Sequence, residues 1–362
     1  MVKTVKVGLG EKSYDILIGY PLDEIGRMLK KYTKGIKSLI VTNPTIAEYY
    51  LETVERSLQE AGFQVFVARV PDGEEHKSQD EANRLYTKCV DYRLERESII
   101  VGLGGGVIGD LAGYVAATFM RGLPIVQVPT TFLAQVDSSV GGKVAVNLPE
   151  GKNLVGSFYQ PFLVYIDFAV LKTLPVEEME AGMAEVIKYG IILDKKFFEY
   201  LEEKIGKLRE LDLEVLERVV ARCCKFKAGV VEKDEREKGL RSILNFGHTL
   251  GHALEALTDY KKYKHGEAVA IGMVGACRIA QEMGMFKKET RDRIEHLIEK
   301  AGLPGRIGVK LSVDDIIQVL SLDKKVRAGK VRFVLPERMG KVVVRNDVPE
   351  DIVRSVVTGL ME

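Results

Sequence analysis

Hydrophobic and polar residues follow an alternating strand and helix pattern over the first half of the chain. Residues 4–19 alternate on both sides of the turn GEK, which predicts a β-hairpin. Apolar runs then predict strands at 38–42, 63–70, 98–103 and 124–129, and helical spacing separates them near 45–61, 78–92 and 106–120. This alternation predicts a mainly parallel sheet with crossover helices.

The second half of the chain has almost continuous helical periodicity. Helix-length segments run from about residue 176 to Leu322, with breaks near Gly239, at 261–265 and at 302–308. A short hairpin pattern (VRFVLP and KVVVRNDV) and a last helix at 350–360 follow. Because 362 residues exceed the usual size of one compact core, we predict two domains, an α/β domain over 1–175 and a mainly helical domain over 176–362.

The composition narrows the class of partner. The chain has 53 basic and 52 acidic residues, a formal net charge of +1, and so no global field that would attract nucleic acid or an anionic membrane. Its four cysteines form no CxxC pair, which indicates packing residues in a reducing cytoplasm and not a disulfide framework. We see neither a signal-peptide core nor an apolar run of roughly 18 residues, so we expect a soluble protein that acts on small molecules.

A glycine-rich turn lies where one strand ends and a helix begins. Gly104, Gly106 and Gly109 form GxGxxG there, and the N–H groups of such a turn can bind a pyrophosphate. The motif departs from a Rossmann fingerprint, because it follows the third strand of the alternation and the next strand leads into PTT, not into an acidic residue. Close helix packing is the structural alternative. A second polar loop, PDGEEHKS at 71–78, is expected at the same edge of the sheet, and the two together favour a nucleotide.

Two further loops carry lysines beside glycines. The segment VDSSVGGKVAVN contains Asp137 and Lys143, and GKNLVGSFYQP contains Lys152 and Asn153. Lysines flanked by glycine suit contacts with anions. Ordinary solvated loop charges are the alternative explanation for either segment taken alone.

One helical segment carries a carboxylate and a lysine on the same face. In EEMEAGMAEVIKYGII these are Glu185 and Lys188. They form either a salt-bridged helix surface or a carboxylate offered to a metal beside a lysine offered to an anionic substrate.

Three of the five histidines fall within 18 residues, in NFGHTLGHALE and KHGEAVAIGM. His248 and His252 stand four apart on one helix face, which Glu255 continues. Two histidines and a carboxylate with an open position suit a catalytic zinc, but spacing alone leaves the ligands undecided. An exposed helix with surface histidines is the alternative. Thr249 stands where the HExxH motif has its glutamate, so a peptidase is disfavoured.

Taken together, these motifs resemble the 3-dehydroquinate synthase family of sugar-phosphate cyclases over essentially the full length. The resemblance is carried, in order, by PDGEEHKS, GGGVIGDLAGYVAATFMRG, QVPTTFLAQVDSSVGGKVAVN, GKNLVGSFYQP, the Glu185 and Lys188 helix, RSILNFGHTLGHALE and HGEAVAIGM. It implies an α/β N-terminal domain with a mainly parallel sheet and a non-standard dinucleotide site, then a mainly α-helical C-terminal domain. The active site is expected in the cleft between the domains.

The resemblance also implies cofactors and their ligands. It places a divalent metal, zinc with cobalt as an alternative, on Glu185, His248 and His265, and it leaves His252 to contact substrate and handle protons. It places NAD on residues that follow the strand ends: Asp72, Gly73, Glu74, Glu75, His76, Lys77, Gly106, Val107, Ile108, Gly109, Asp110, Thr130, Thr131, Lys143, Lys152, Val170, Leu171, Lys172 and Thr173.

The resemblance further implies the substrate contacts. Lys143, Asn153, Lys188, Lys227, Arg241, Asn245 and His252 are expected to bind substrate, and all of these except Asn153 are expected, with Asp137, to act in the reaction. Arg121 is expected to reach the phosphate of a neighbouring subunit, which implies a homodimer. One more family lysine corresponds to Lys324, Lys325 or Lys330.

The implied reaction converts 3-deoxy-D-arabino-heptulosonate 7-phosphate to 3-dehydroquinate and phosphate in the shikimate route to aromatic amino acids, with NAD used catalytically. The alternatives are a sister cyclase that makes 2-deoxy-scyllo-inosose or a valiolone, a glycerol-type metal-dependent alcohol dehydrogenase, and a catalytically silent metal- and nucleotide-binding protein. Lys152, Asn153, Lys188 and Arg241 together suit a substrate that carries both a phosphate and a carboxylate. Net accumulation of NADH with a simple polyol would favour the dehydrogenase.

Overall fold

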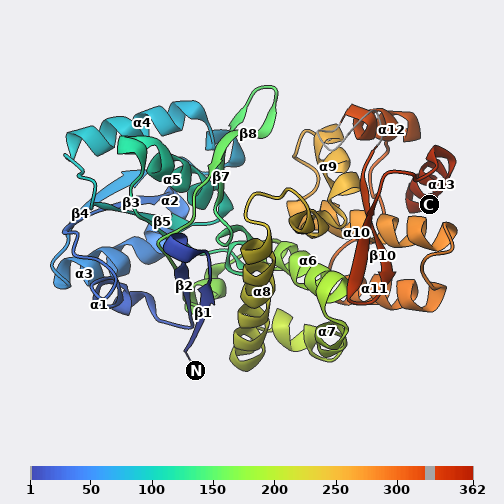
Figure 1. The fold of residues 1–362 in the computed structure, drawn as a ribbon, viewed down its shortest axis with the longest axis horizontal. Helices are drawn as coiled ribbons and strands as arrows, with labels where there is room; N and C mark the ends of the chain where they lie inside the picture. The colour runs from blue at the N-terminus through green and yellow to red at the C-terminus, as the bar shows by residue number, and fades with distance from the viewer. Residues whose placement is uncertain (1, 323–330, 362) are drawn as a thin grey trace. The chain divides into compact units, whose positions relative to one another are not determined.

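Two compact units make up the chain in a computed structural model that describes residues 2–322 and 331–361. The N-terminal unit comprises Met1–Leu174 and Leu216–Arg236, and the C-terminal unit comprises Pro175–Val215 and Glu237–Glu362 (Figure 1). The division into domains at residues 175 and 176 stays a prediction, because compactness alone does not show which segments fold independently.

A seven-stranded sheet forms the centre of the N-terminal unit. Its strands lie in the order β1 (Lys3–Val7), β2 (Tyr14–Ile18), β9 (Leu163–Ile166), β6 (Ile125–Pro129), β5 (Ile99–Gly104), β3 (Lys37–Thr42) and β4 (Gln64–Arg69). β1 and β2 form the predicted antiparallel hairpin, and every other neighbouring pair is parallel. The mainly parallel α/β architecture is therefore confirmed.

Helices cover the sheet on both faces, which explains the continuous apolar runs of its central strands. All residues of β5, β6 and β9 are buried, as is typical of parallel strands between two helical layers. The connecting helices are α1 (Ile25–Leu29), α2 (Pro44–Ile46), α3 (Glu52–Glu60), α4 (Gln79–Asp91) and α5 (Gly106–Thr118), with most of α8 (Leu213–Lys233) in the same unit (Figure 1). Shorter helical turns are η1 (Gly10–Lys12), η2 (Leu22–Glu24), η3 (Ala47–Leu51), η4 (Glu74–His76), η5 (Phe119–Arg121), η6 (Ala134–Ser138) and η7 (Ala169–Thr173).

Three strands of the N-terminal unit were not predicted. β7 (Lys143–Leu148) and β8 (Gly151–Phe158) pair as a separate antiparallel hairpin, in segments that the sequence analysis read as polar loops. β8 is largely exposed, so its sequence lacks a regular apolar alternation, and the pairing register shifts in β7 between Val146 and Leu148. β9 is a run of only four apolar residues.

The C-terminal unit is mainly helical, as predicted. Its elements are α6 (Val176–Leu193), α7 (Lys195–Arg209), η8 (Leu240–Asn245), α9 (His248–Leu257), α10 (His265–Glu282), α11 (Lys288–Lys300), α12 (Val313–Leu322) and α13 (Glu350–Met361), and β10 (Phe333–Arg338) pairs antiparallel with β11 (Lys341–Arg345).

Glycines allow α6, α9 and α10 to pack backbone against backbone. A Cβ atom at Gly266 would lie 2.2 Å from the carbonyl oxygen of Ala181, and one at Gly272 would lie 1.9 Å from that of Gly247. Real side chains cannot approach so closely, so a larger residue at either glycine must separate the helices. This packing sets the mutual positions of the three helices that carry the candidate site.

Two expectations from composition can be compared with the structure. The four cysteines, Cys89, Cys223, Cys224 and Cys277, are buried free thiols, which confirms their role in packing. Among the described helices, none is both long and apolar enough to cross a bilayer.

Candidate active site

One carboxylate and two imidazoles from three helices converge in the C-terminal unit. Glu185 lies on α6, His248 at the start of α9 and His265 at the start of α10, and their candidate ligand atoms all lie within 4.8 Å of one another. The Nε2 atoms of His248 and His265 lie 3.6 and 3.9 Å from the Oε1 atom of Glu185. The structure therefore brings the three predicted metal ligands together. Nitrogen and oxygen donors of this kind are those that zinc takes in catalytic sites.

The Glu185 carboxylate is buried inside the C-terminal unit. Its side chain is 1% exposed, and neither of its oxygens accepts a hydrogen bond within the described chain. The ammonium of Lys188, also buried, is its ion-pair partner. The interpretation of this pair as a helix surface is therefore wrong. Lys188 compensates the charge at Oε2, while Oε1 faces the Nε2 atoms of His248 and His265, and a carboxylate oxygen that converges with two imidazole nitrogens fits a divalent metal.

A backbone carbonyl orients His248. The Nδ1 atom of His248 lies 3.0 Å from the carbonyl oxygen of Phe246, so Nδ1 carries the proton and donates it. The lone pair is then on Nε2, the atom that faces Glu185. This is the tautomer that a metal ligand needs.

His252 belongs to a second group of residues that could bind a metal. The ring of His252 lies 5.3 Å from that of His248 and 6.1 Å from that of His265, measured between centroids. His252, Glu255 and His265 form another group that could hold a metal. Geometry alone thus defines two overlapping sets that share His265.

Glu255 is a buried acidic residue that sequence analysis treated only as part of a polar stripe. Its Oε1 atom lies 3.4 Å from Nδ1 of His265, and the residue is 6% exposed. Burial lowers the pKa of His265, but the hydrogen bond and charge of Glu255, together with the charge of Glu185, raise the pKa by more. The polar stripe of α9 is therefore not wholly exposed, since Glu255 is buried, although His252 on the same stripe is partly exposed.

A buried cation and an amide lie just before α9. Arg241 is 2% exposed, and Asn245 donates from Nδ2 to Oε1 of Glu237 at 2.6 Å. Both lie in η8, the turn that leads into the histidine segment. Glu237, which helps to hold Asn245, was missed by the sequence analysis because it lies in a generic charged stretch.

In the N-terminal unit, the two predicted nucleotide loops meet through Lys77. This lysine is 4% exposed and donates to Oδ2 of Asp110 at 2.5 Å and to Oδ1 of Asn153 at 2.6 Å. Burial raises the pKa of Asp110, and the charge of Lys77 opposes that rise. One ammonium thus ties the loop after β4 to the start of α5 and to the β7–β8 hairpin.

The glycine-rich turn is packed very closely. A Cβ atom at Gly105 would lie 2.9 Å from Cγ2 of Thr131, and one at Gly109 would lie 2.7 Å from Oε1 of Gln127. Close packing of α5 against β6 therefore accounts for Gly109 of the motif, and the nearby Thr131 side chain restricts Gly105. The hydroxyl of Thr130, at the end of β6, is buried and has no hydrogen-bond partner in the described part of the chain.

Other predicted residues of the N-terminal unit occupy the same edge or neighbouring turns. Lys152 Nζ lies 3.9 Å from Oε1 of Glu74, and the hydroxyl of Thr45, after β3, donates to Asp72 at 3.1 Å. The Tyr50 hydroxyl donates to the Val170 carbonyl at 3.0 Å. Thr45 was missed because VTNPT carries no recognised motif, although a position just after a parallel strand is itself a signal.

Four further predicted residues lie in η6, α8, β7 and η5. Lys227 Nζ lies 2.9 Å from Asp137 Oδ1 and donates to the Asp137 carbonyl at 2.8 Å. Lys143 begins β7 and is exposed, and Arg121 is exposed with φ +69°. The three C-terminal alternatives, Lys324, Lys325 and Lys330, lie outside the described residues.

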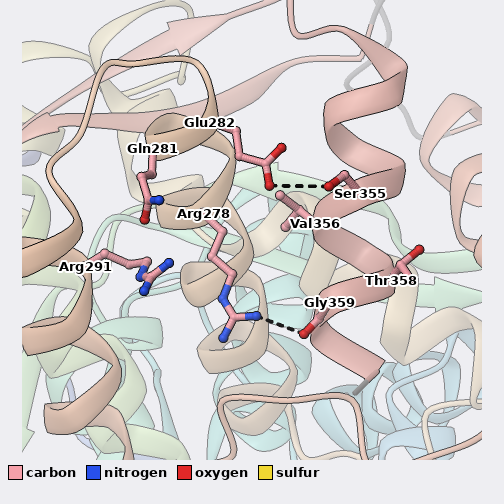
Figure 2. Close-up of a pocket in the computed structure, with 8 residues that line it drawn as sticks. All are labelled: Arg278, Gln281, Glu282, Arg291, Ser355, Val356, Thr358 and Gly359. Carbon is pink, nitrogen blue, oxygen red and sulfur yellow. Dashed lines mark hydrogen bonds between the residues drawn. The ribbon is translucent and has the colours of Figure 1, made fainter.

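A separate cavity of about 510 Å³ is bordered by residues of α10, α11 and α13 (Figure 2). It is lined by Arg278, Gln281, Glu282, Arg291, Ser355, Val356, Thr358 and Gly359. The guanidinium of Arg278 is already engaged, because it donates to Gly359 at 2.9 Å and to both carboxylate oxygens of Glu295. None of the predicted site residues borders this cavity.

Solved structures with the same fold define the class of protein. A 2-deoxy-scyllo-inosose synthase complexed with carbaglucose-6-phosphate, NAD⁺ and Co²⁺ matches with a TM-score of 0.91 and 27% identity, over 99% of this chain and 100% of the other. A 2-epi-5-epi-valiolone synthase from Streptomyces hygroscopicus with NAD⁺ and Zn²⁺ bound matches with a TM-score of 0.89 and 25% identity, over 98% of both. The chain has the fold of the sugar-phosphate cyclases.

Sequence comparison then identifies the family. Residues 67–181 match the family model of the 3-dehydroquinate synthase N-terminal domain, and residues 182–326 match that of the C-terminal domain. The 3-dehydroquinate synthase of Nostoc punctiforme is 51% identical over 363 residues, which span 99% of this chain and 100% of the relative. The chain belongs to the 3-dehydroquinate synthase family, which confirms the resemblance seen in the sequence.

Proposed function

We propose that the chain catalyses the conversion of 3-deoxy-D-arabino-heptulosonate 7-phosphate to 3-dehydroquinate and phosphate, a step toward aromatic amino acids, in the cytoplasm. The observation that carries the proposal is the buried Glu185 carboxylate facing His248 and His265 in a chain of this family. NAD and a divalent metal, zinc or cobalt, are the proposed cofactors. When bound, they supply a reversible hydride acceptor and a Lewis acid that polarises a substrate oxygen.

In this proposal the imidazoles divide their roles by position. Glu185, His248 and His265 hold the metal, and three protein ligands leave a position open to substrate. His252, one turn after His248, contacts the substrate and moves a proton. Asp137 serves a second proton transfer at a reacting hydroxyl, and its charge is held by Lys227 at 2.9 Å.

Buried cations suit a substrate with two anionic ends. Lys188 and Arg241 are each 2% exposed, and Lys227 is 6% exposed. A cation away from water binds phosphate or carboxylate more strongly than a solvated one does. We assign the substrate's phosphate and carboxylate to Lys143, Asn153, Lys188, Lys227, Arg241 and Asn245. This set favours the heptulosonate phosphate over sugar phosphates that lack a carboxylate.

We further propose a homodimer, in which Arg121 reaches the phosphate bound to the neighbouring subunit. Arg121 is exposed, and it follows Met120, which is exposed as well and also has a positive φ of +50°. Two consecutive non-glycine residues with positive φ are a strained backbone conformation. Such strain is retained where the surrounding structure or a function requires it.

The NAD site is assigned to the polar carboxyl edge of the sheet. Its proposed contacts are 72–77, 106–110, Thr130, Thr131, Lys143, Lys152 and 170–173. The N–H groups at the start of α5 suit a pyrophosphate, and Lys77 holds three of the surrounding segments together.

The Lys77→Met variant is expected to bind NAD about 10–150-fold more weakly, because losing a hydrogen bond from a charged group costs about 1.5–3 kcal/mol. Isothermal titration with NAD measures the change. The control is Lys88→Met, which removes an exposed lysine that lies 3.7 Å from Asp91 on α4. Equal NAD affinity in the two variants would contradict the role assigned to Lys77.

A turnover assay tests the proposed function. Purified full-length chain, zinc and substoichiometric NAD are mixed with the heptulosonate phosphate, and phosphate and 3-dehydroquinate are followed. We expect both products in equal amounts, exceeding the NAD added. Parallel reactions contain glucose 6-phosphate, which lacks a carboxylate, or glycerol. Turnover of glucose 6-phosphate alone, NADH accumulation with glycerol alone, or no turnover at all would each overturn the proposal.

A further inference from the structure

We propose that Glu255 is a positioning residue that holds the metal ligand His265 in place through Nδ1. The inference rests on the proposed function, in that it takes Glu185, His248 and His265 as the metal ligands. It assigns a role to the buried carboxylate of α9 that the motif spacing did not indicate.

The two ligand imidazoles present the same atom to the same carboxylate. Nε2 of His248 and Nε2 of His265 lie 3.6 and 3.9 Å from Oε1 of Glu185. Their Nδ1 atoms face other acceptors, the Phe246 carbonyl at 3.0 Å for His248 and Oε1 of Glu255 at 3.4 Å for His265. A proton on each Nδ1 leaves both Nε2 lone pairs free for one ion. Glu255 thus does for His265 what the backbone does for His248.

The charge and burial of Glu255 favour this role. The residue is 6% exposed, so its carboxylate contributes little to solubility and needs partners inside the protein. A carboxylate acceptor makes an imidazole a stronger electron donor than a neutral carbonyl does. Glu255 also links α9 to the start of α10. This contact fixes the ring of His265, whose side chain is 33% exposed and so is less restrained by packing.

The competing arrangement makes Glu255 a direct ligand. His252, Glu255 and His265 form the second group that could hold a metal, and it would use the side of His265 that faces Glu255. Glu185 would then stay outside the metal site. The Glu185 set is favoured because Oε1 of Glu185 is buried, accepts no hydrogen bond in the described chain and faces Nε2 of both His248 and His265, whereas Oε2 is ion-paired with Lys188.

Metal affinity of the full-length chain separates these roles. Metal-free Glu255→Ala and Glu255→Gln are titrated with zinc and cobalt against a competing chelator. We expect the alanine variant to bind about 10–100-fold more weakly, the range found for loss of such outer partners. The glutamine variant keeps an acceptor without the charge, so its loss should be smaller but measurable. The cobalt absorption bands should shift in both variants, while their intensity stays that of a four-coordinate site.

The control is Thr249→Val on the same helix. Thr249 is 5% exposed and donates to the Arg332 carbonyl at 3.1 Å, so its loss perturbs α9 without touching a ligand. We expect its metal affinity to equal that of the wild type. If Glu255→Ala fails to fold, Glu255→Gln decides, since it preserves the volume of the side chain.

The other possible results of these experiments would overturn the role of Glu255, the proposed function, or both. Wild-type affinity in Glu255→Gln, or in a folded Glu255→Ala, would overturn the proposal. Loss of metal in both Glu255→Ala and His252→Ala, with binding intact in His248→Ala, would make Glu255 a ligand and overturn it as well. A wild-type chain that binds no divalent metal would overturn both this inference and the proposed function. The expected affinity pattern without formation of 3-dehydroquinate would overturn the function alone.

Discussion

His248→Ala is expected to lower zinc affinity about a thousandfold, equivalent to about 4 kcal/mol, and to abolish measurable turnover. Nε2 of His248 lies 3.6 Å from Oε1 of Glu185, and Nδ1 of the same ring donates a hydrogen bond to the Phe246 carbonyl. Alanine removes one of three protein ligands and leaves the Glu185 charge less compensated. Metal content after dialysis, measured by mass spectrometry, and the turnover assay report the two effects separately.

His252→Ala is the matched control, one helical turn further along α9. Its ring lies 5.3 Å from that of His248, so both substitutions remove an imidazole from the same helix face. We expect His252→Ala to keep its zinc and to lose most of its turnover, because we assign His252 to the substrate. The reverse result, metal lost in His252→Ala and kept in His248→Ala, would show that the second candidate set is the metal site.

The central strands were predictable because burial on both faces leaves a continuous apolar run. The strand predicted at 98–103 corresponds to β5 (Ile99–Gly104), and that at 124–129 to β6 (Ile125–Pro129). The hairpin of β7 and β8 was not predictable in the same way. The residues of β8 are mostly exposed, so hydrophobic patterning does not separate this hairpin from a loop.

The candidate site was predictable in residue type but not in arrangement. An i, i+4 spacing places His248 and His252 on one face, and it does not show which of them meets a carboxylate from another helix. That carboxylate, Glu185, comes from α6, a contact that no local spacing encodes. The contact of Glu255 with His265 was not predictable for the same reason: a helix pattern does not reveal that a polar stripe is covered by a neighbouring helix, here the start of α10.

Gly272→Ala is expected to lower the free energy of unfolding of the protein by about 3 kcal/mol, the upper end of what overpacking usually costs. The new Cβ atom would lie 1.9 Å from the carbonyl oxygen of Gly247, a backbone atom that cannot rotate aside. Gly247 immediately precedes His248 and is itself packed against α10, where a Cβ atom on it would lie 2.7 Å from the carbonyl oxygen of Val269, so it has little room to adjust. α9 and α10 must therefore move apart, and His248 moves away from His265.

Gly206→Ala on α7 provides the control for glycine replacement itself. A Cβ atom at Gly206 meets nothing within 4 Å, so alanine should stabilise this helix by about 0.5–1 kcal/mol. Urea unfolding followed by circular dichroism compares the two variants, and zinc titration of each tests the site. Equal stability of the two would contradict the close packing of α9 and α10. Because the ligands sit on the helices that Gly272→Ala separates, zinc affinity must fall in that variant and remain unchanged in Gly206→Ala.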